Sequence, residues 1–202
     1  MGMLQYMKKM YKINEIFRSV QTEGINTGRD TVFVRFSGCN LSCQFCDTNH
    51  SSFTKMSKYD IEKEVKALDR DGTALVVLTG GEPTVQITDD EPLFINRKNV
   101  AIETNGIGHV PWWCTHITVS PKTKLSEYQY KKADEIKVVY DTISSNEIRK
   151  IESISRKFGT PLYIQPKADK HDKFDIEPVI KFVQSHPLWK ISVQWHKLTG
   201  IR

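Results

Sequence analysis

The stretch Ser37-Gly38-Cys39-Asn40-Leu41-Ser42-Cys43-Gln44-Phe45-Cys46-Asp47-Thr48 places three thiols in one short loop with the spacing C-x3-C-x2-C. Three thiolates leave a structural zinc site one protein ligand short. A four-iron cluster fits them better, because its remaining iron can bind the amino and carboxylate groups of S-adenosylmethionine (SAM) for one-electron cleavage. On spacing alone, two alternatives stay open: a zinc knuckle completed by His50 or Cys114, and a disulfide with one spare thiol.

The segments that flank this loop favour the cluster. Residues 31–36, Thr-Val-Phe-Val-Arg-Phe, predict the first strand of a barrel, leading directly to Cys39. The apolar run 74–79 predicts a strand buried on both faces, and it ends in Gly80-Gly81-Glu82-Pro83. Paired glycines let the backbone approach a ligand closely, and the Glu82 carboxylate can accept hydrogen bonds from an ammonium group such as that of SAM.

The rest of the chain predicts an α/β fold with uneven helical cover. Further strands are predicted at residues 99–103, 116–120, 135–139, 161–165 and 190–194, and helices at 57–72, 146–158 and 175–185. Residues 85–98 and 104–115 lack a helical stripe of useful length. Because parallel strands need helices on their outer face, we expect an incomplete barrel whose thinly covered part is closed by a second copy of the chain, in a homodimer.

Length and composition predict one domain in a reducing compartment. The 202 residues, 39% apolar and 26% charged, suit a single domain over residues 1–202, with residues 1–11 expected to be a disordered leader. The cysteines do not resemble a secreted disulfide framework, and no signal peptide or membrane span is recognisable, so a cytoplasmic location is expected. The net charge of +5 is spread along the chain, which argues against nucleic acid as a partner.

Three motifs in order carry a resemblance to a known superfamily. Cys39/Cys43/Cys46, Gly80-Gly81-Glu82-Pro83 and Glu103-Thr104-Asn105-Gly106 resemble those of radical-SAM proteins, whose fold is an incomplete, TIM-like (β/α)6 barrel. Within that superfamily the chain looks like the 7-carboxy-7-deazaguanine synthase family of queuosine biosynthesis. The stretches that carry this closer resemblance are residues 14–17, 21–24, 33–35, 46–48, 120–122, 165–166 and 194–197.

This resemblance implies a SAM-dependent ring contraction that converts 6-carboxy-5,6,7,8-tetrahydropterin to 7-carboxy-7-deazaguanine with loss of ammonia. It also implies a [4Fe-4S] cluster, Mg²⁺ and an external one-electron reductant such as a flavodoxin-like protein. Carried over by position, Cys39, Cys43 and Cys46 would hold the cluster and Thr48 the Mg²⁺; Val20, Gln21, Thr22, Arg35 and Thr79 would bind the pterin; Gly81, Ser120, Pro121, Lys122, Gln165, Pro166, Lys167 and Ala168 would bind SAM. No side chain is assigned as an acid or base.

Several of these residues have a second interpretation. Arg35 offers a planar fork for a substrate carboxylate, but it could instead be paired inside the barrel. Thr48 could cap the turn after Cys46, and Glu103 could either bond the SAM ribose or face a lysine. Thr22 stands where the family usually has glycine, which leaves pterin placement there in question. Two other functions stay open: a glycyl-radical-enzyme activase and a non-catalytic zinc-binding module.

Overall fold

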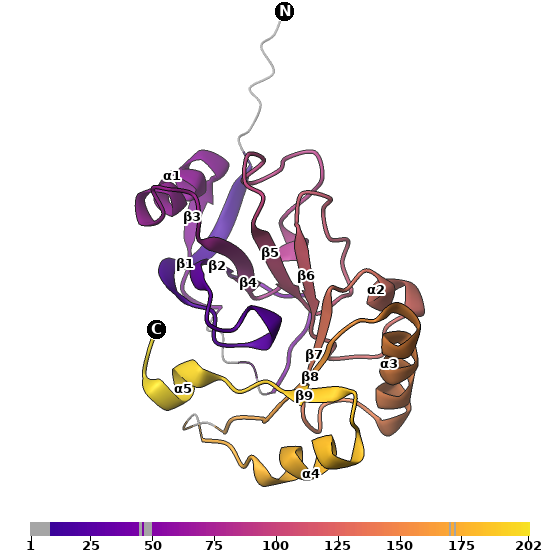
Figure 1. Ribbon diagram of the computed structural model, residues 1–202. Coiled ribbons are helices and arrows are strands. Elements are labelled where there is room, and N and C mark those ends of the chain that lie inside the picture. The colour runs from indigo at the N-terminus through magenta and orange to yellow at the C-terminus, as the bar shows by residue number, and fades with distance from the viewer. Residues whose placement is uncertain (1–8, 45, 47–49, 170, 172) are drawn as a thin grey trace, which may run out of the picture.

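A nine-stranded sheet in the order β3-β1-β2-β4-β5-β6-β7-β8-β9 runs through the computed structural model, which describes residues 9–44, 46, 50–169, 171 and 173–202. The strands are β1 (Met10–Val20), β2 (Asp30–Phe36), β3 (Thr54–Ser57), β4 (Leu75–Gly80), β5 (Val100–Thr104), β6 (His116–Val119), β7 (Glu135–Val139), β8 (Leu162–Gln165) and β9 (Trp189–Ile191). From β2 to β9 all neighbours are parallel, whereas β1 is antiparallel to β2 and β3. The sheet curls into an open barrel, as the sequence predicted (Figure 1).

Strand β1 corrects the expected extent of the leader. Met10 and Tyr11 already belong to β1, and Tyr11 is fully buried with its hydroxyl donating to Glu91 at 3.0 Å. The leader prediction is therefore wrong for these two residues, because a buried aromatic ring stabilises the start of the strand. Residues 1–8 lie outside the described part of the chain.

The helices begin and end where local sequence signals act. They are α1 (Lys58–Leu68), α2 (Glu127–Lys131), α3 (Ser145–Phe158), α4 (Glu177–Ser185) and α5 (Trp195–Thr199), with single 3-10 turns η1 (Gly24–Asn26) and η2 (Pro83–Val85). Ser57 and Asp60 form a capping box at the start of α1, and Gly159 ends α3 in the left-handed conformation with φ 73°. Helix α1 stops at Leu68, before the expected glycine, and the short helices α2 and α5 were not predicted.

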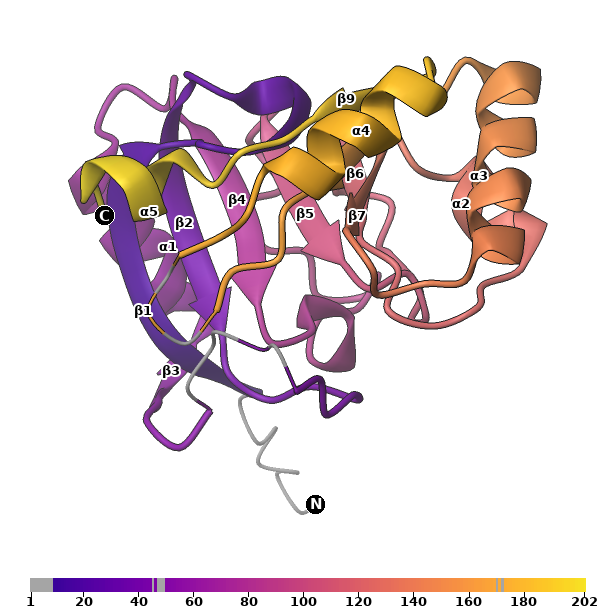
Figure 2. The ribbon, with the colours of Figure 1, turned by 90° about the horizontal axis from the view of Figure 1, so that it is seen from below.

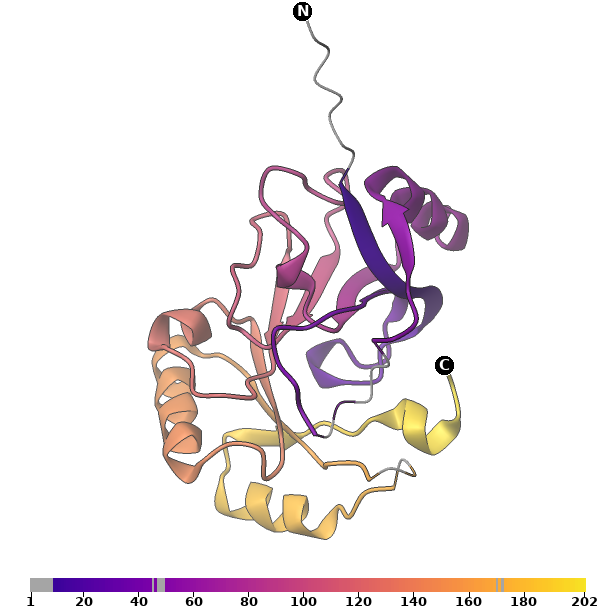
Figure 3. The same ribbon diagram turned by 180° about the vertical axis from the view of Figure 1, so that it is seen from behind.

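Helices cover the two ends of the sheet but not its middle. Helix α1 packs beside β1 and β3, and α3 and α4 cover the strands from β7 to β9 (Figure 2). Loops and not helices run beside β5 (Figure 3). Leu93, Phe94 and Trp113 from these loops belong to the apolar core. This agrees with the absence of a helical pattern in residues 85–98 and 104–115. Within the described ranges, no helix is both long and apolar enough to cross a bilayer.

Candidate active site

The inner face of the barrel changes from apolar to polar along the strands. Side chains alternate between the two faces of a strand, so Phe33 and Arg35 of β2 point inward while Val32 and Val34 are buried in the outer core. The parallel register aligns Arg35 with Thr79 of β4. Leu78 likewise pairs with Ile102, so Glu103 of β5 comes next to Thr79 in the same layer. A polar layer therefore forms where the parallel strands end, the usual site of ligand binding in such barrels.

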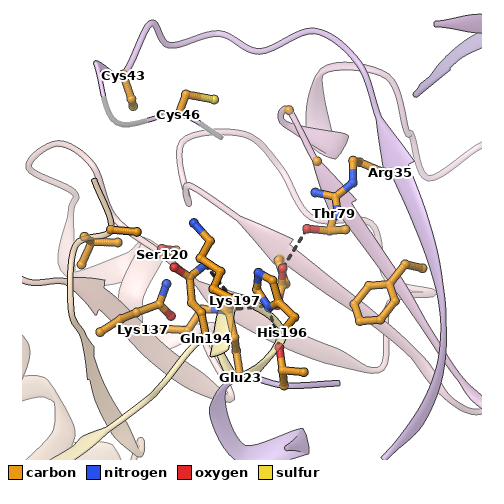
Figure 4. Close-up of a pocket in the computed structure, with 18 of the residues that line it drawn as sticks. Glu23, Arg35, Cys43, Cys46, Thr79, Ser120, Lys137, Gln194, His196 and Lys197 are labelled. Carbon is orange, nitrogen blue, oxygen red and sulfur yellow. Dashed lines mark hydrogen bonds and ion pairs between the residues drawn. The ribbon is translucent and has the colours of Figure 1, made fainter. Parts of the chain in front are cut away.

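Lys137 of β7 joins this layer to the turn after β1. Its ammonium lies 2.6 Å from Glu23 Oε2 and 3.2 Å from Glu103 Oε1, and only 7% of its side chain is exposed (Figure 4). Burial acts against the charged ammonium, but the carboxylates of Glu103 and Glu23 more than offset it and raise the pKa of Lys137. Burial also acts to raise the pKa of Glu23, yet the charge and hydrogen bond of Lys137 bring it below the ordinary value. The ammonium and the two carboxylates form one charge unit inside the barrel.

Of the two roles expected for Glu103, the structure shows the contact with a lysine inside the barrel. Besides Lys137, it accepts hydrogen bonds from Thr79 Oγ1 at 2.7 Å and from Gln21 Nε2 at 3.3 Å. A carboxylate with these contacts positions the neighbouring Thr79 and Gln21. Both of these residues were predicted to bind the pterin, and both line the cavity.

Arg35 is paired and lines the cavity as well. Its Nε donates to Glu15 Oε1 at 2.8 Å, and the other oxygen of Glu15 accepts from Arg202 Nη2 at 2.7 Å. Both guanidinium groups lie over the Phe17 ring, at 5.8 Å for Arg35 and 4.9 Å for Arg202. Because Glu15 binds the Nε side of Arg35, its pairing is compatible with ligand binding through the Nη nitrogens.

The cysteine loop lies at another wall of the same cavity. Cys43 and Cys46 lie together in Figure 4, and Cys39 Sγ accepts the backbone N–H of Leu41 at 3.4 Å. Burial raises the pKa of the Cys43 thiol, an effect that the Lys122 ammonium opposes and the other two cysteines reinforce. The described side chains do not by themselves gather three ligands around a single ion. Three soft thiols facing one cavity nevertheless suit an iron–sulfur cluster, which spans several ångströms. The expected magnesium ligand, Thr48, lies outside the described residues.

Gly81 holds the cysteine loop against the barrel. A Cβ at this position would overlap the Gly38 carbonyl, so only glycine allows the two backbones to pack. The next amide, Glu82 N–H, donates to the Gly38 carbonyl at 2.9 Å. The residue before the first cysteine, Gly38, is therefore in direct contact with the Gly-Gly-Glu-Pro turn, and this contact helps to position Cys39.

Glu82, which was expected to bind SAM, lies away from the cavity. Its side chain is fully buried and does not line the cavity. One carboxylate oxygen accepts from the hydroxyls of Thr84 and Thr104 at 2.6 and 2.8 Å, and the other from Asn105 N–H at 2.7 Å. Sequence could not reveal these contacts, because the donor Thr104 is the last residue of the next strand, β5, and Asn105 follows it.

The other residues expected to bind SAM line the same cavity, with one exception. The cavity is lined by Gly81, Ser120, Lys122, Gln165, Pro166, Lys167 and Ala168, but not by Pro121. Lys122 donates to Ser120 Oγ at 2.5 Å, and burial, helped by the charge of Lys137, lowers the pKa of Lys122 to about 8. Gln165 Oε1 is buried and has no hydrogen-bond partner among the described groups. An acceptor of this kind fits a ligand that donates a hydrogen bond.

The C-terminal segment completes the cavity with residues that the site prediction did not include. Gln194 Nε2 donates to Glu23 Oε1 at 3.0 Å, and His196 Nδ1 lies 2.8 Å from Thr22 Oγ1 (Figure 4). Thr22, the departure from the family pattern, is therefore accommodated by a hydrogen bond to His196. The sequence signal for these residues was the stretch 194–197, which carried the resemblance but no assigned role.

All these residues line one cavity of about 1200 Å³.

Residues 33–112, which include the cysteine loop, match the family model of the radical SAM superfamily. The chain is 40% identical to 7-carboxy-7-deazaguanine synthase of Bacteroides thetaiotaomicron, covering 96% of this chain and all of the relative. It is 34% identical to the Haemophilus influenzae enzyme of the same name, covering 95% and 94%. Among solved structures, QueE from Escherichia coli matches with a TM-score of 0.69 and 27% identity, over 92% of this chain and 94% of that one.

The barrel, the cysteine loop and these matches define a radical SAM enzyme with a TIM-like fold. The fold is also similar to that of Streptococcus suis SuiB, solved bound to S-adenosylmethionine, at 16% identity and a TM-score of 0.51 over 77% of this chain and 45% of that one. Within the class, the chain belongs to the 7-carboxy-7-deazaguanine synthase family.

Proposed function

We propose that this enzyme converts 6-carboxy-5,6,7,8-tetrahydropterin to 7-carboxy-7-deazaguanine and ammonia, using SAM and a [4Fe-4S] cluster. The observation that carries the proposal is the single cavity that joins the cysteine loop to a polar barrel interior. The names of the relatives that match over nearly the whole chain support the same reaction. The product plus ammonia accounts for every atom of the substrate, so no additional oxidant is consumed.

The cofactors would lie at the wall formed by the cysteine loop. Cys39, Cys43 and Cys46 would hold the cluster, which with SAM supplies one-electron cleavage of a carbon–sulfur bond and so starts the reaction. The glycine backbone at Gly81 and the Gln165 Oε1 acceptor, which has no partner among the described groups, support SAM binding in the same cavity as this loop. Lys122, held by Ser120, adds a cation suited to the SAM carboxylate.

The pterin would occupy the polar layer of the barrel. The Nη nitrogens of Arg35 suit its carboxylate, and Gln21 and Thr79, positioned by Glu103, suit the donor and acceptor edge of its ring. Val20 and Thr22 line the same part of the cavity. Thr48 would bind Mg²⁺ together with substrate oxygens, because this ion prefers hard oxygen ligands and keeps several waters.

Anaerobic reconstitution followed by mass spectrometry of the products tests the reaction. The wild-type protein should contain stoichiometric iron and sulfide and form 7-carboxy-7-deazaguanine from the pterin. A Cys43→Ala variant should form none, whereas Cys114→Ala, which changes a buried core thiol, should keep the activity. A Cys43→Ala protein that still makes the product, or wild-type protein that carries only zinc, would refute the proposal. Activity that requires a partner polypeptide would instead indicate a glycyl-radical-enzyme activase.

We also propose a homodimer that covers the middle of the sheet. Apolar side chains on the loops that replace the missing helices are exposed there, with Val85 at 55%, Ile95 at 54% and Trp112 at 65%. Light scattering at micromolar concentration should give a dimer, and Trp112→Glu should shift it toward monomer. A wild-type monomer would remove this inference.

The reaction further requires an external one-electron donor, for which a flavodoxin-like protein is proposed. We infer that the enzyme works in the cytoplasm, because the four cysteines are free thiols and the cluster would be sensitive to oxygen. Product formation with a purified flavodoxin and its reductase, compared with dithionite, tests the electron donor. A flavodoxin that reduces the cluster but supports no product formation would contradict the proposed electron donor.

A further inference from the structure

His50 follows the cysteine loop and is held by residues that precede it. Ser37 Oγ donates to the His50 carbonyl at 3.1 Å, and Gly38 N–H donates to the ring atom Nδ1 at 3.2 Å. Both ends of the loop are therefore tied together at this histidine. His50 has no role in the proposed function.

The contact from Gly38 decides the tautomer of the ring. A nitrogen that accepts a backbone amide hydrogen carries no hydrogen of its own, so the hydrogen of the neutral imidazole is on Nε2. That atom lies 3.8 Å from Cys46 Sγ, within the range of a hydrogen bond to sulfur. The structure thus aims an N–H group at one of the three thiols of the loop.

Gly38, which donates to the His50 ring, is itself held by backbone contacts with the turn after β4. Gly38 packs against Gly81 without room for a Cβ, and its carbonyl accepts Glu82 N–H at 2.9 Å. Glu82 is in turn buried and bonded to Thr104 and Asn105. The direction of the Nε2–H group is therefore determined by the same packing that positions Cys39.

We propose that His50 is a positioning residue that donates an N–H···S hydrogen bond to the Cys46 thiolate and raises the reduction potential of the cluster. The inference rests on the proposed function, since it requires Cys46 to be a cluster ligand. Reduction adds negative charge that is shared with the ligand sulfurs, so a hydrogen-bond donor stabilises the reduced state more than the oxidised one. Cys39 receives its N–H from the backbone of Leu41, whereas the donor to Cys46 is a replaceable side chain.

A potentiometric titration monitored by electron paramagnetic resonance measures this effect without turnover. His50→Phe keeps a planar ring but loses the donor, and we expect its cluster to be reduced about tenfold less favourably, a potential lower by about 59 mV for one electron. His50→Gln retains an N–H group, so its potential should fall by less than half as much as that of His50→Phe. His109→Phe, a surface histidine paired with Asp89, is the matched control and should leave the potential unchanged. All samples are compared at equal iron and sulfide content and without SAM.

A His50→Phe protein with full cluster content and the wild-type potential would overturn the proposal. If that variant assembles no complete cluster, electron–nuclear double resonance on wild-type protein labelled with ¹⁵N-histidine decides instead. A ¹⁵N coupling to the reduced cluster that disappears in His50→Gln supports the bond, and no coupling refutes it. Wild-type protein without iron and sulfide would be a different result, because it would refute the proposed function itself.

Discussion

Replacing Lys137 with methionine tests the buried charge unit at the centre of the barrel. The substitution keeps the length of the side chain but removes the ammonium that lies 2.6 Å from Glu23 and 3.2 Å from Glu103. These carboxylates are only 13% and 23% exposed, so water cannot replace the lost partner fully. The variant retains two neighbouring negative charges with no cation between them.

The expected loss of stability is large at neutral and alkaline pH. Removing one partner of a buried ion pair typically costs about 3–5 kcal/mol, because the remaining charge is left uncompensated. We expect a decrease of about 3 kcal/mol or more in the free energy of unfolding at pH 8. Repulsion between Glu23 and Glu103 acts in the same direction.

The loss should shrink as the pH falls. In the wild type the pKa of Glu23 is lowered by Lys137, so the pair contributes stability above the ordinary glutamate pKa and loses it as the pH falls toward the folded-state value. In the variant, Glu23 loses the charge and the hydrogen bond of Lys137, which are the main effects that oppose its burial, so its pKa rises and it becomes neutral at a higher pH than in the wild type. The difference between variant and wild type should therefore be smaller at pH 5 than at pH 8.

Urea unfolding followed by circular dichroism measures both differences. The matched control is Lys157→Met, which breaks a surface pair with Glu127 at a similar distance of 2.9 Å and should leave the stability nearly unchanged. Equal stability of Lys137→Met and the control at pH 8 would refute the reasoning. A loss of the same size at both pH values would show that the missing contacts are apolar and not electrostatic.

Three further changes have expected outcomes. Gly81→Ala should bind less than about half the wild-type iron after anaerobic reconstitution, because its Cβ overlaps the Gly38 carbonyl, and full iron content would contradict that packing. Thr22→Val, which deletes the hydrogen bond to His196, should lower kcat/KM about tenfold while Thr22→Ser keeps most of it; equal values for all three proteins would exclude a role for the bond. Burial raises the pKa of Cys114 to about 12, so iodoacetamide at pH 8 should leave it unmodified in the folded protein and alkylate it only after unfolding, as peptide mass spectrometry would reveal.

Local sequence patterns predicted most of the elements correctly because their causes are local. The capping pair Ser57 and Asp60 marks the start of α1, and the apolar run before Gly80 marks a buried strand. The two segments without a helical stripe indeed form no α-helix in the described structure. Short elements such as α2 and α5 were missed, since about five residues carry too little periodicity to be recognised.

The sequence by itself determined the cysteine spacing, the glycine-rich turn, the alternation of the strands and, through its resemblance, the family. These features lie within a few residues of one another or repeat along one strand, so no folded structure is needed to read them. Only the tertiary structure decided which charged groups meet: Glu103 faces Lys137, Glu82 is buried outside the cavity, Arg35 is paired with Glu15, and His196 bonds Thr22. The partners come from different strands and loops, up to 174 residues apart, and only the register and curvature of the sheet bring them together.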